Sequence, residues 1–305
     1  MINVVFSTMY YPVAIGKYFD FALRRRDDVN LCTVGPWTST WIPWNGGMYM
    51  PEKYSTPPDI PLSKSFCGQI NVTPKVIESS LLPFKPDLWI NADAGFAFSK
   101  PDCQYAVIAT DPHVLTYDFQ RTQADKFYNM QFCYSKPGDK YLPYCADPEY
   151  HSPLEEYHDK KEYDVCLIGL HYPNRTNLVN RLRAKGLKVY YDIGIAYHEY
   201  NEIYSKSKIA LSWSSMDDLI ARVFEGMLMA VPVVCNRVPD ISTHFVDGED
   251  YYGFDNIDEA EVQVHMALAN YDDAQEVAWK AHRKVKANHL YDYRISDILR
   301  DFRLI

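Results

Sequence analysis

Residues 203–236 read IYSKSKIALSWSSMDDLIARVFEGMLMAVPVVCN, and this stretch decides the fold. An apolar run at 208–212 is followed by a polar loop, a helical pattern and a second apolar run at 231–235. Short apolar runs bounded by turn residues are typical of buried strands, and strands that alternate with helices predict βαβ units. The stretch therefore predicts a strand, a loop, a helix and a second strand of one parallel sheet.

The same alternation extends in both directions along the chain. Further strands are predicted at 2–6, 29–34, 87–91, 104–109, 163–169 and 187–191, and helical stretches at 17–26, 176–185 and over the C-terminal 30 residues. The polar, proline-marked segment 147–162 indicates a linker. We expect two Rossmann-like, doubly wound α/β domains that face each other across a cleft. The expected boundaries are 1–150, a linker at 151–162, a second domain at 163–285 and a C-terminal helix at 286–305 that packs back towards the first domain.

The composition excludes several classes of protein. Of the 305 residues, 47% are hydrophobic, 15% aromatic and 23% charged, which excludes a disordered chain. No run of about 18 apolar residues is present, so no membrane span is expected. The net charge of −9 argues against a protein that coats nucleic acid by charge alone. Seven cysteines without a CxxC pair, and an N-terminus without a signal-peptide pattern, favour the cytoplasm.

The loop and helix at the centre of the decisive stretch carry the candidate chemistry. Asp217 and Asp218 precede the helix, and Arg222 and Glu225 lie three positions apart on one helix face. A helix N-terminus that faces a cleft attracts anions, because its first N–H groups lack partners within the helix. A carboxylate just inside such a helix suits two adjacent hydroxyls, such as those of a ribose.

Four motifs stand in order along this half of the chain. They are Tyr204-Ser205-Lys206, Arg222-Val223-Phe224-Glu225, Ala230-Val231-Pro232-Val233-Val234 and His289-Leu290-Tyr291-Asp292-Tyr293-Arg294. With their spacing, they resemble the donor-binding region of GT-B glycosyltransferases, and most closely the glycosyltransferase group 1-like domain of the spore maturation protein CgeB family. The resemblance covers about 163–300, with a weaker match at 142–151.

The resemblance implies roles for several residues. In such enzymes the motif glutamate binds the ribose of a nucleotide sugar, a role that falls here to Glu225, and Ser214 and Arg222 join it as donor-binding residues. The acidic residue eight positions earlier, Asp217, is implied to contact the sugar. Asp217 stands where retaining members have a glutamate, and Ala230 stands where the usual residue is glycine. Both departures leave the identity of the sugar and the stereochemical outcome open.

Three further donor contacts are expected in loops that follow predicted strands. Gly16 follows the first strand, where a glycine lets the backbone approach a phosphate, although a plain turn explains it equally well. Arg175 opens the first helix of the second half and is a candidate clamp for the diphosphate, with a solvated helix-start residue as the alternative. Tyr191 follows the next strand, where such folds hold the nucleobase.

The acceptor is expected on the first domain. Asp111 and His113 follow the strand 104–109, and either side chain can act as the base that an inverting transferase needs. Asp93 is a weaker rival after the preceding strand. The aromatic, proline-rich segment 36–61 is long enough to suggest a function. It is either a platform for an acceptor or a packed lid.

We therefore expect a metal-independent glycosyltransferase, a hexosyl- or pentosyltransferase, that moves a sugar from a nucleotide-diphosphate donor to an acceptor hydroxyl. A UDP-sugar is the expected donor, no other cofactor is expected, and the oligomeric state stays open. One alternative acceptor is a hydroxymethylated base of phage-type DNA, reached by base flipping. That alternative requires one basic face on the first domain, built from Arg24, Arg25, Arg26, Lys64, Lys75, Lys136 and Lys140. A second alternative is a non-catalytic GT-B-like binding protein.

Overall fold

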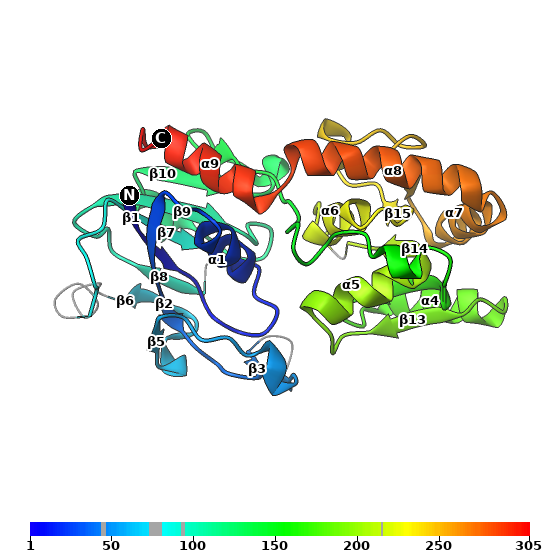
Figure 1. Ribbon diagram of the computed structural model, residues 1–305, viewed down its shortest axis with the longest axis horizontal. Coiled ribbons are helices and arrows are strands. Elements are labelled where there is room, and N and C mark those ends of the chain that lie inside the picture. The colour runs from blue at the N-terminus through cyan, green and yellow to red at the C-terminus, as the bar shows by residue number, and fades with distance from the viewer. Residues whose placement is uncertain (44–46, 73–80, 93–94, 215) are drawn as a thin grey trace. The chain divides into compact units, whose positions relative to one another are not determined.

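A computed structural model describes residues 1–43, 47–72, 81–92, 95–214 and 216–305. The chain forms two compact units (Figure 1). The first comprises Met1–Pro143 together with Tyr291–Ile305, and the second comprises Tyr144–Leu290. The stretch 151–162, expected as a linker, lies in the second unit and contains the short helix η4 (Glu155–Tyr157).

The first unit is built on a parallel sheet of seven strands. Their order is β11-β10-β9-β7-β1-β2-β5, and every neighbouring pair runs parallel. The strands are β1 (Ile2–Ser7), β2 (Val29–Pro36), β5 (Ile60–Leu62), β7 (Leu88–Ala92), β9 (Gln104–Ala109), β10 (Lys126–Asn129) and β11 (Lys140–Tyr141). β7 is buried at every position, as expected for a central strand covered on both faces.

Helices and short strands complete the first unit. They are α1 (Gly16–Arg24), α3 (Asp118–Gln123), α9 (Tyr291–Asp301), β3 (Trp41–Ile42), β4 (Met48–Tyr49), β6 (Gln69–Val72), β8 (Phe96–Phe98), η1 (Glu52–Tyr54), η2 (Lys64–Phe66) and η3 (Phe132–Tyr134). Figure 1 shows α9 beside α1, and the stacked rings of Tyr18 and Tyr291 join the two helices at 5.4 Å. Arg25 adds a bidentate ion pair to Asp292, at 3.1 and 2.8 Å.

The aromatic segment 36–61 is partly folded onto this unit. β3 and β4 pair in antiparallel fashion, with Trp41 opposite Tyr49. The buried Lys17 ammonium of α1 donates to the Tyr54 carbonyl at 3.1 Å, which ties the segment to the first helix. Tyr49 remains 77% exposed. Trp44 lies outside the described residues, so the choice between an acceptor platform and a lid stays open.

The second unit is a five-stranded parallel sheet in the order β13-β12-β14-β15-β16. The strands are β12 (Tyr163–Ile168), β13 (Val189–Asp192), β14 (Ser207–Ser212), β15 (Val233–Asn236) and β16 (Tyr252–Phe254). The helices are α4 (Pro173–Ala184), α5 (Tyr197–Ser205), α6 (Ala221–Leu228), η5 (Ile241–Thr243), α7 (Ile257–Ala269) and α8 (Tyr271–Asn288). The α/β prediction, with parallel sheets, is confirmed.

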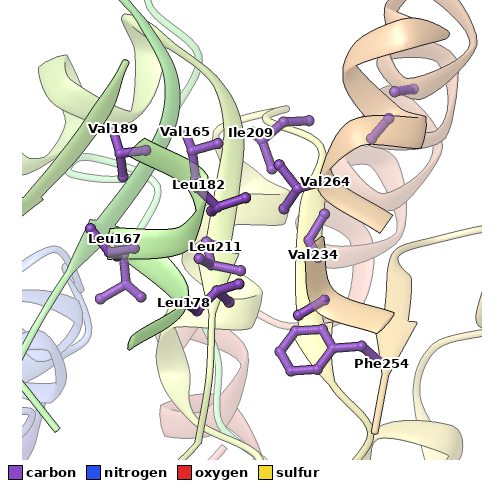
Figure 2. Close-up of a cluster of buried hydrophobic side chains, with 14 residues drawn as sticks. Val165, Leu167, Leu178, Leu182, Val189, Ile209, Leu211, Val234, Phe254 and Val264 are labelled. Carbon is purple, nitrogen blue, oxygen red and sulfur yellow. The ribbon is translucent and has the colours of Figure 1, made fainter. Parts of the chain in front are cut away.

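Buried aliphatic side chains hold the second sheet against α4 and α7. Leu178 and Leu182 of α4 and Val264 of α7 meet side chains such as Leu167 and Leu211 from the strands (Figure 2). All five are 0% exposed. At about 1.5–3 kcal/mol for each large apolar side chain removed from water, this cluster stabilises the packing of the two helices on the sheet.

The helical region expected over the C-terminal 30 residues contains parts of two helices. α8 ends at Asn288 and α9 begins at Tyr291. Between them, the His289 carbonyl accepts the Ala146 N–H at 3.0 Å, and Leu290 forms a parallel bridge to Ala146. This pairing takes His289 out of the helix where the chain passes from one unit to the other. None of the helices in the described part of the chain has the length and apolar character that a membrane crossing requires.

Candidate functional site

The candidate donor site lies at the carboxyl ends of β12 and β14. These strands are parallel neighbours, so the loop before α4 and the loop before α6 emerge at the same edge of the sheet. Arg175 comes from the first loop and helix, and Ser214, Asp217, Arg222 and Glu225 come from the second. The fold thus brings together residues that are 50 positions apart in the sequence, from Arg175 to Glu225.

Arg175 is buried and held by two backbone carbonyls. Its Nε donates to Trp213 O at 2.7 Å and its Nη1 donates to Leu170 O at 3.1 Å. The guanidinium also lies 4.9 Å from the centroid of the Tyr172 ring. Burial, together with the neighbouring Arg222 guanidinium, lowers the pKa of Arg175 to about 10. A residue that is 5% exposed and fixed in this way is no solvated helix-start residue.

Arg222 lies next to Arg175, with Gly169 between them. A Cβ at Gly169 would stand 2.4 Å from Arg222 Nη2 and 3.5 Å from Arg175 Nη1, so both guanidinium groups approach this glycine. Gly169 has φ +149°, a conformation that favours glycine. Arg222 Nη1 is buried, and no hydrogen-bond partner for it is found among the described residues. Within that same part of the chain, no carboxylate forms an ion pair with either arginine.

A cavity of about 230 Å³ opens beside Arg175. It is lined by Tyr172, Pro173, Asn174, Arg175, Trp213 and Ser214. Three of these residues form the first turn of α4, whose leading N–H groups have no acceptor within the helix. A helix N-terminus and a buried guanidinium at one cavity make a site that is suited to an anion.

The loop between β14 and α6 is held by Ser214 and Asp218. Ser214 N–H donates to Asn236 Oδ1 at 2.7 Å, and the Ser214 hydroxyl donates to Asp218. The Asp218 N–H returns a bond to Ser214 Oγ at 3.1 Å. Asp217, by contrast, is exposed and has φ +55°, which aspartate tolerates better than most residues. Asp218 therefore orders the loop, and Asp217 projects from it.

Glu225 lies on α6, and its side chain is 11% exposed. Its Oε2 accepts the Tyr200 hydroxyl at 2.7 Å, and its Oε1 lies 3.9 Å from His151 Nε2. Neither Tyr200 nor His151 was predicted as part of the site. His151 belongs to the weakly matching motif at 142–151, whereas the contact of Tyr200 joins residues 25 positions apart and has no local signal in the sequence.

Ala230, which stands where the usual residue is glycine, caps the C-terminal end of α6. Its φ is +53°, its N–H bonds to Met227 O at 3.0 Å, and the Val231 N–H bonds to Gly226 O at 3.2 Å. These two bonds form a Schellman cap, in which a left-handed residue closes the helix. Glycine fits that position at no steric cost, so this departure concerns the helix cap.

Tyr191 lies at the same edge of the sheet, on β13. Its hydroxyl is 3.2 Å from Thr176 Oγ1 of α4, and its ring centroid lies 4.3 Å from that of His171. His171 belongs to the loop that follows β12, so this contact joins that loop to β13. A role in holding a nucleobase stays a prediction.

The other predicted residues belong to the first unit. A Cβ at Gly16 would fall 2.2 Å from Thr8 Oγ1, so this glycine lets α1 approach the end of β1. Asp111 accepts the Thr110 hydroxyl at 3.0 Å, and its N–H donates to the Tyr117 hydroxyl at 3.3 Å. The His113 ring centroid lies 5.9 Å from that of Tyr134. Asp93 lies outside the described residues.

Comparison with known proteins supports a glycosyltransferase fold. Residues 151–300 match the glycosyl transferase-like family. No curated protein sequence matches the chain.

Solved structures match the chain over its whole length. Sucrose-phosphate synthase from Thermosynechococcus elongatus has a TM-score of 0.65 at 11% identity, over 100% of this chain and 99% of that one. An alpha-glucosyltransferase, solved with UDP-glucose and DNA containing an abasic site, has a TM-score of 0.68 at 10% identity, over 99% of each chain. Anabaena HepE, solved with UDP and glucose, has a TM-score of 0.66 at 11% identity, over 99% and 100%. The chain is therefore similar to GT-B glycosyltransferases in fold, and to a glycosyl transferase-like family in sequence.

Proposed function

We propose, from the glycosyl transferase-like match of residues 151–300, that this chain transfers a sugar from a nucleoside-diphosphate donor to an acceptor hydroxyl. The observation that carries the proposal is the pair Arg175 and Arg222, two adjacent guanidinium groups without a carboxylate partner among the described residues. Like charges held this close at a cavity favour a bound anion.

The proposed ligand of this pair is the diphosphate of the donor. When the sugar leaves, negative charge develops on the nucleoside diphosphate, and fixed positive groups stabilise that charge. Arg175 is suited to this task because two carbonyls hold it in place before the ligand arrives. Two guanidinium groups and the α4 N-terminus supply this stabilisation without a metal ion.

The remaining donor contacts are assigned as the resemblance to GT-B glycosyltransferases implies. Glu225 is assigned to the ribose hydroxyls, Asp217 to the sugar and Tyr191 to the base, with UDP as the preferred nucleotide and a hexose or pentose as the sugar. Ser214 lines the cavity beside Arg175 and is assigned to the phosphates. The acceptor is assigned to the first unit, where Asp111 or His113 removes the acceptor proton.

The ion pairs of the first unit do not favour DNA as the acceptor. Five of the six described basic residues that such a face would need already pair with a carboxylate. These pairs are Arg24 with Asp20 and Asp59, Arg25 with Asp292, Arg26 with Asp28, Lys136 with Asp118, and Lys140 with Asp301. A paired lysine or arginine contributes less to the neutralisation of phosphates.

A donor screen tests the proposal. The purified chain is incubated with UDP- and GDP-sugars and a mixture of acceptors, and released nucleotide and glycosylated products are read by mass spectrometry. In parallel, UDP and GDP binding is measured by calorimetry for Arg175→Gln, with Arg181→Gln as the matched control. Arg181 lies on the same helix but pairs with Asp258 and Glu261.

We expect Arg175→Gln to weaken binding of the preferred nucleotide by roughly tenfold or more, the value of a charge-assisted hydrogen bond. Arg181→Gln should leave the affinity unchanged. Nucleotide binding without turnover of any donor would favour the non-catalytic alternative. If neither nucleotide binds the wild-type chain, the proposal is wrong.

A further inference from the structure

A buried group of polar side chains surrounds the Glu225 carboxylate, and none of them lines the cavity beside Arg175. Tyr200 and Tyr204 are one turn apart on α5, and their ring centroids are 4.6 Å apart. Tyr200 is 9% exposed, Tyr204 is 0% exposed and His151 is 0% exposed. The Glu225 side chain is 11% exposed, and a buried hydroxyl in contact with its carboxylate is placed to control the orientation of that group.

The hydrogen bonds run in one direction, towards Glu225. The Tyr200 hydroxyl lies 2.7 Å from Glu225 Oε2 and 3.0 Å from the Tyr204 hydroxyl. A phenol has one proton and an ionised carboxylate can only accept, so Tyr200 donates to Glu225 and Tyr204 supplies the proton of the second bond. Burial raises the pKa of Tyr200 well above its usual value, which keeps this donor protonated.

His151 faces the other oxygen of the same carboxylate. Its Nδ1 accepts the Asp147 N–H at 3.0 Å, which places the proton of the neutral ring on Nε2. That nitrogen lies 3.9 Å from Glu225 Oε1. Burial lowers the pKa of His151, so the ring stays neutral. Glu225 is thus anchored firmly at Oε2 and only loosely approached at Oε1.

We infer that Tyr200 is a positioning residue whose hydroxyl holds the Glu225 carboxylate for a vicinal diol, and so sets the preference of this site for ribose over 2′-deoxyribose nucleotides. The inference rests on the proposed function, in which Glu225 meets the ribose. It concerns the orientation of the carboxylate, which the diphosphate contacts of Arg175 and Arg222 do not require.

The physical reason lies in the rotation of the carboxylate. Two adjacent hydroxyls donate to both oxygens of one carboxylate only when the carboxylate plane faces them. In a glutamate without such an anchor this rotation is soft, because torsions between sp³ and sp² carbons have broad minima. Tyr200 uses one lone pair of Oε2 and leaves the other available, so it fixes the plane without blocking the diol.

The experiment compares two pairs of nucleotides on the wild-type chain and two variants. Calorimetry gives the Kd of UDP against 2′-deoxy-UDP, and of GDP against 2′-deoxy-GDP, for the wild-type chain, Tyr200→Phe and Tyr157→Phe. Tyr157 is the matched control, because its hydroxyl also donates to a glutamate, Glu202, at 3.2 Å in the same unit. Thermal unfolding establishes that each variant is folded.

We expect the wild-type chain to bind the ribonucleotide more tightly than the 2′-deoxyribonucleotide. This comparison uses whichever of UDP and GDP the chain binds better. Tyr200→Phe should reduce that preference about tenfold by weakening the ribonucleotide alone, as expected for the loss of a hydrogen bond to a charged group. Tyr157→Phe should leave the preference unchanged. If Tyr200→Phe does not fold, Tyr204→Phe carries the test, with a fall of about threefold expected for the loss of a hydrogen bond between neutral groups.

Each other outcome counts against the inference. An unchanged ratio in folded Tyr200→Phe, or an equal loss of both nucleotides, shows that the hydroxyl has no positioning role. A wild-type chain that binds nucleotides without preferring ribose overturns the inference and leaves the proposed function intact. Failure of the wild-type chain to bind any of the four nucleotides overturns the proposed function, and the inference with it.

Discussion

Replacing Gly169 with alanine tests the arginine pair through a residue that carries no functional group. The added Cβ would lie 2.4 Å from Arg222 Nη2 and 3.2 Å from Arg222 Cζ, well inside van der Waals contact. The guanidinium has to move, because Gly169 is fixed between the end of β12 and the loop before α4. Its N–H bonds to Asp192 O at 2.9 Å.

We expect two effects of this substitution, one on the free energy of folding and one on nucleotide affinity. Alanine at φ +149° costs about 1–3 kcal/mol of folding free energy, because that conformation is sparsely populated by residues with a Cβ. Displacement of Arg222 removes a charge-assisted contact to the anion, worth about 1.5–3 kcal/mol, or roughly a tenfold to hundredfold loss of nucleotide affinity.

The assay measures urea unfolding and nucleotide binding for Gly169→Ala and for Gly186→Ala. Gly186 has φ +88° and nothing within 4 Å of an added Cβ, so that variant carries backbone strain alone. Both variants should lose stability, but only Gly169→Ala should lose affinity. A folded Gly169→Ala that binds UDP or GDP as tightly as the wild-type chain would refute the assignment of the arginine pair to the diphosphate.

Three other predictions concern separate features. Either Asp111→Asn or His113→Ala should lower turnover by about 10²–10⁴-fold, with nucleotide Kd unchanged, if that residue is the base. Ala230→Gly should raise the free energy of unfolding by about 0.5–1 kcal/mol, measured in urea, because glycine relieves the left-handed cap. Burial lowers the pKa of Lys17 from 10.5 to about 8, so between these pH values the unfolded chain binds one more proton. The wild-type chain should therefore gain at most about 3 kcal/mol relative to Lys17→Met as the pH rises through that window, checked by urea unfolding.

The central strands could be predicted from the sequence because they are buried on both faces. β1, β7, β9, β12 and β14 appear there as continuous apolar runs bounded by turn residues, which is the pattern a parallel sheet requires. Two edge strands, β5 and β16, could not be predicted in this way. β16 has only three residues with a glycine at its centre, and β5 contains a proline. Such strands form because a neighbouring strand of the sheet supplies their backbone hydrogen-bond partners.

The site was predictable to the extent that its residues stand in local motifs. Arg175 and Arg222 were named separately, but their approach across Gly169 depends on the pairing of β12 with β14. Tyr200 and Glu225 meet for a similar reason, since α5 and α6 lie on either side of β14 in the chain. The catalytic assignments of Asp111, His113 and Asp217 stay predictions, because they depend on where an acceptor binds.

The position of α9 has a consequence for biosynthesis. The first unit includes Tyr291–Ile305, whereas the second unit is a continuous stretch of chain from Tyr144 to Leu290. As the polypeptide leaves the ribosome, the second unit emerges complete while the first still lacks the helix that covers Tyr18 and Phe19. The first unit, although it begins the chain, therefore reaches its final packing only after the whole second unit has been synthesised. Until then, Tyr18 and Phe19 of α1 lack the Tyr291 ring that packs against both of them.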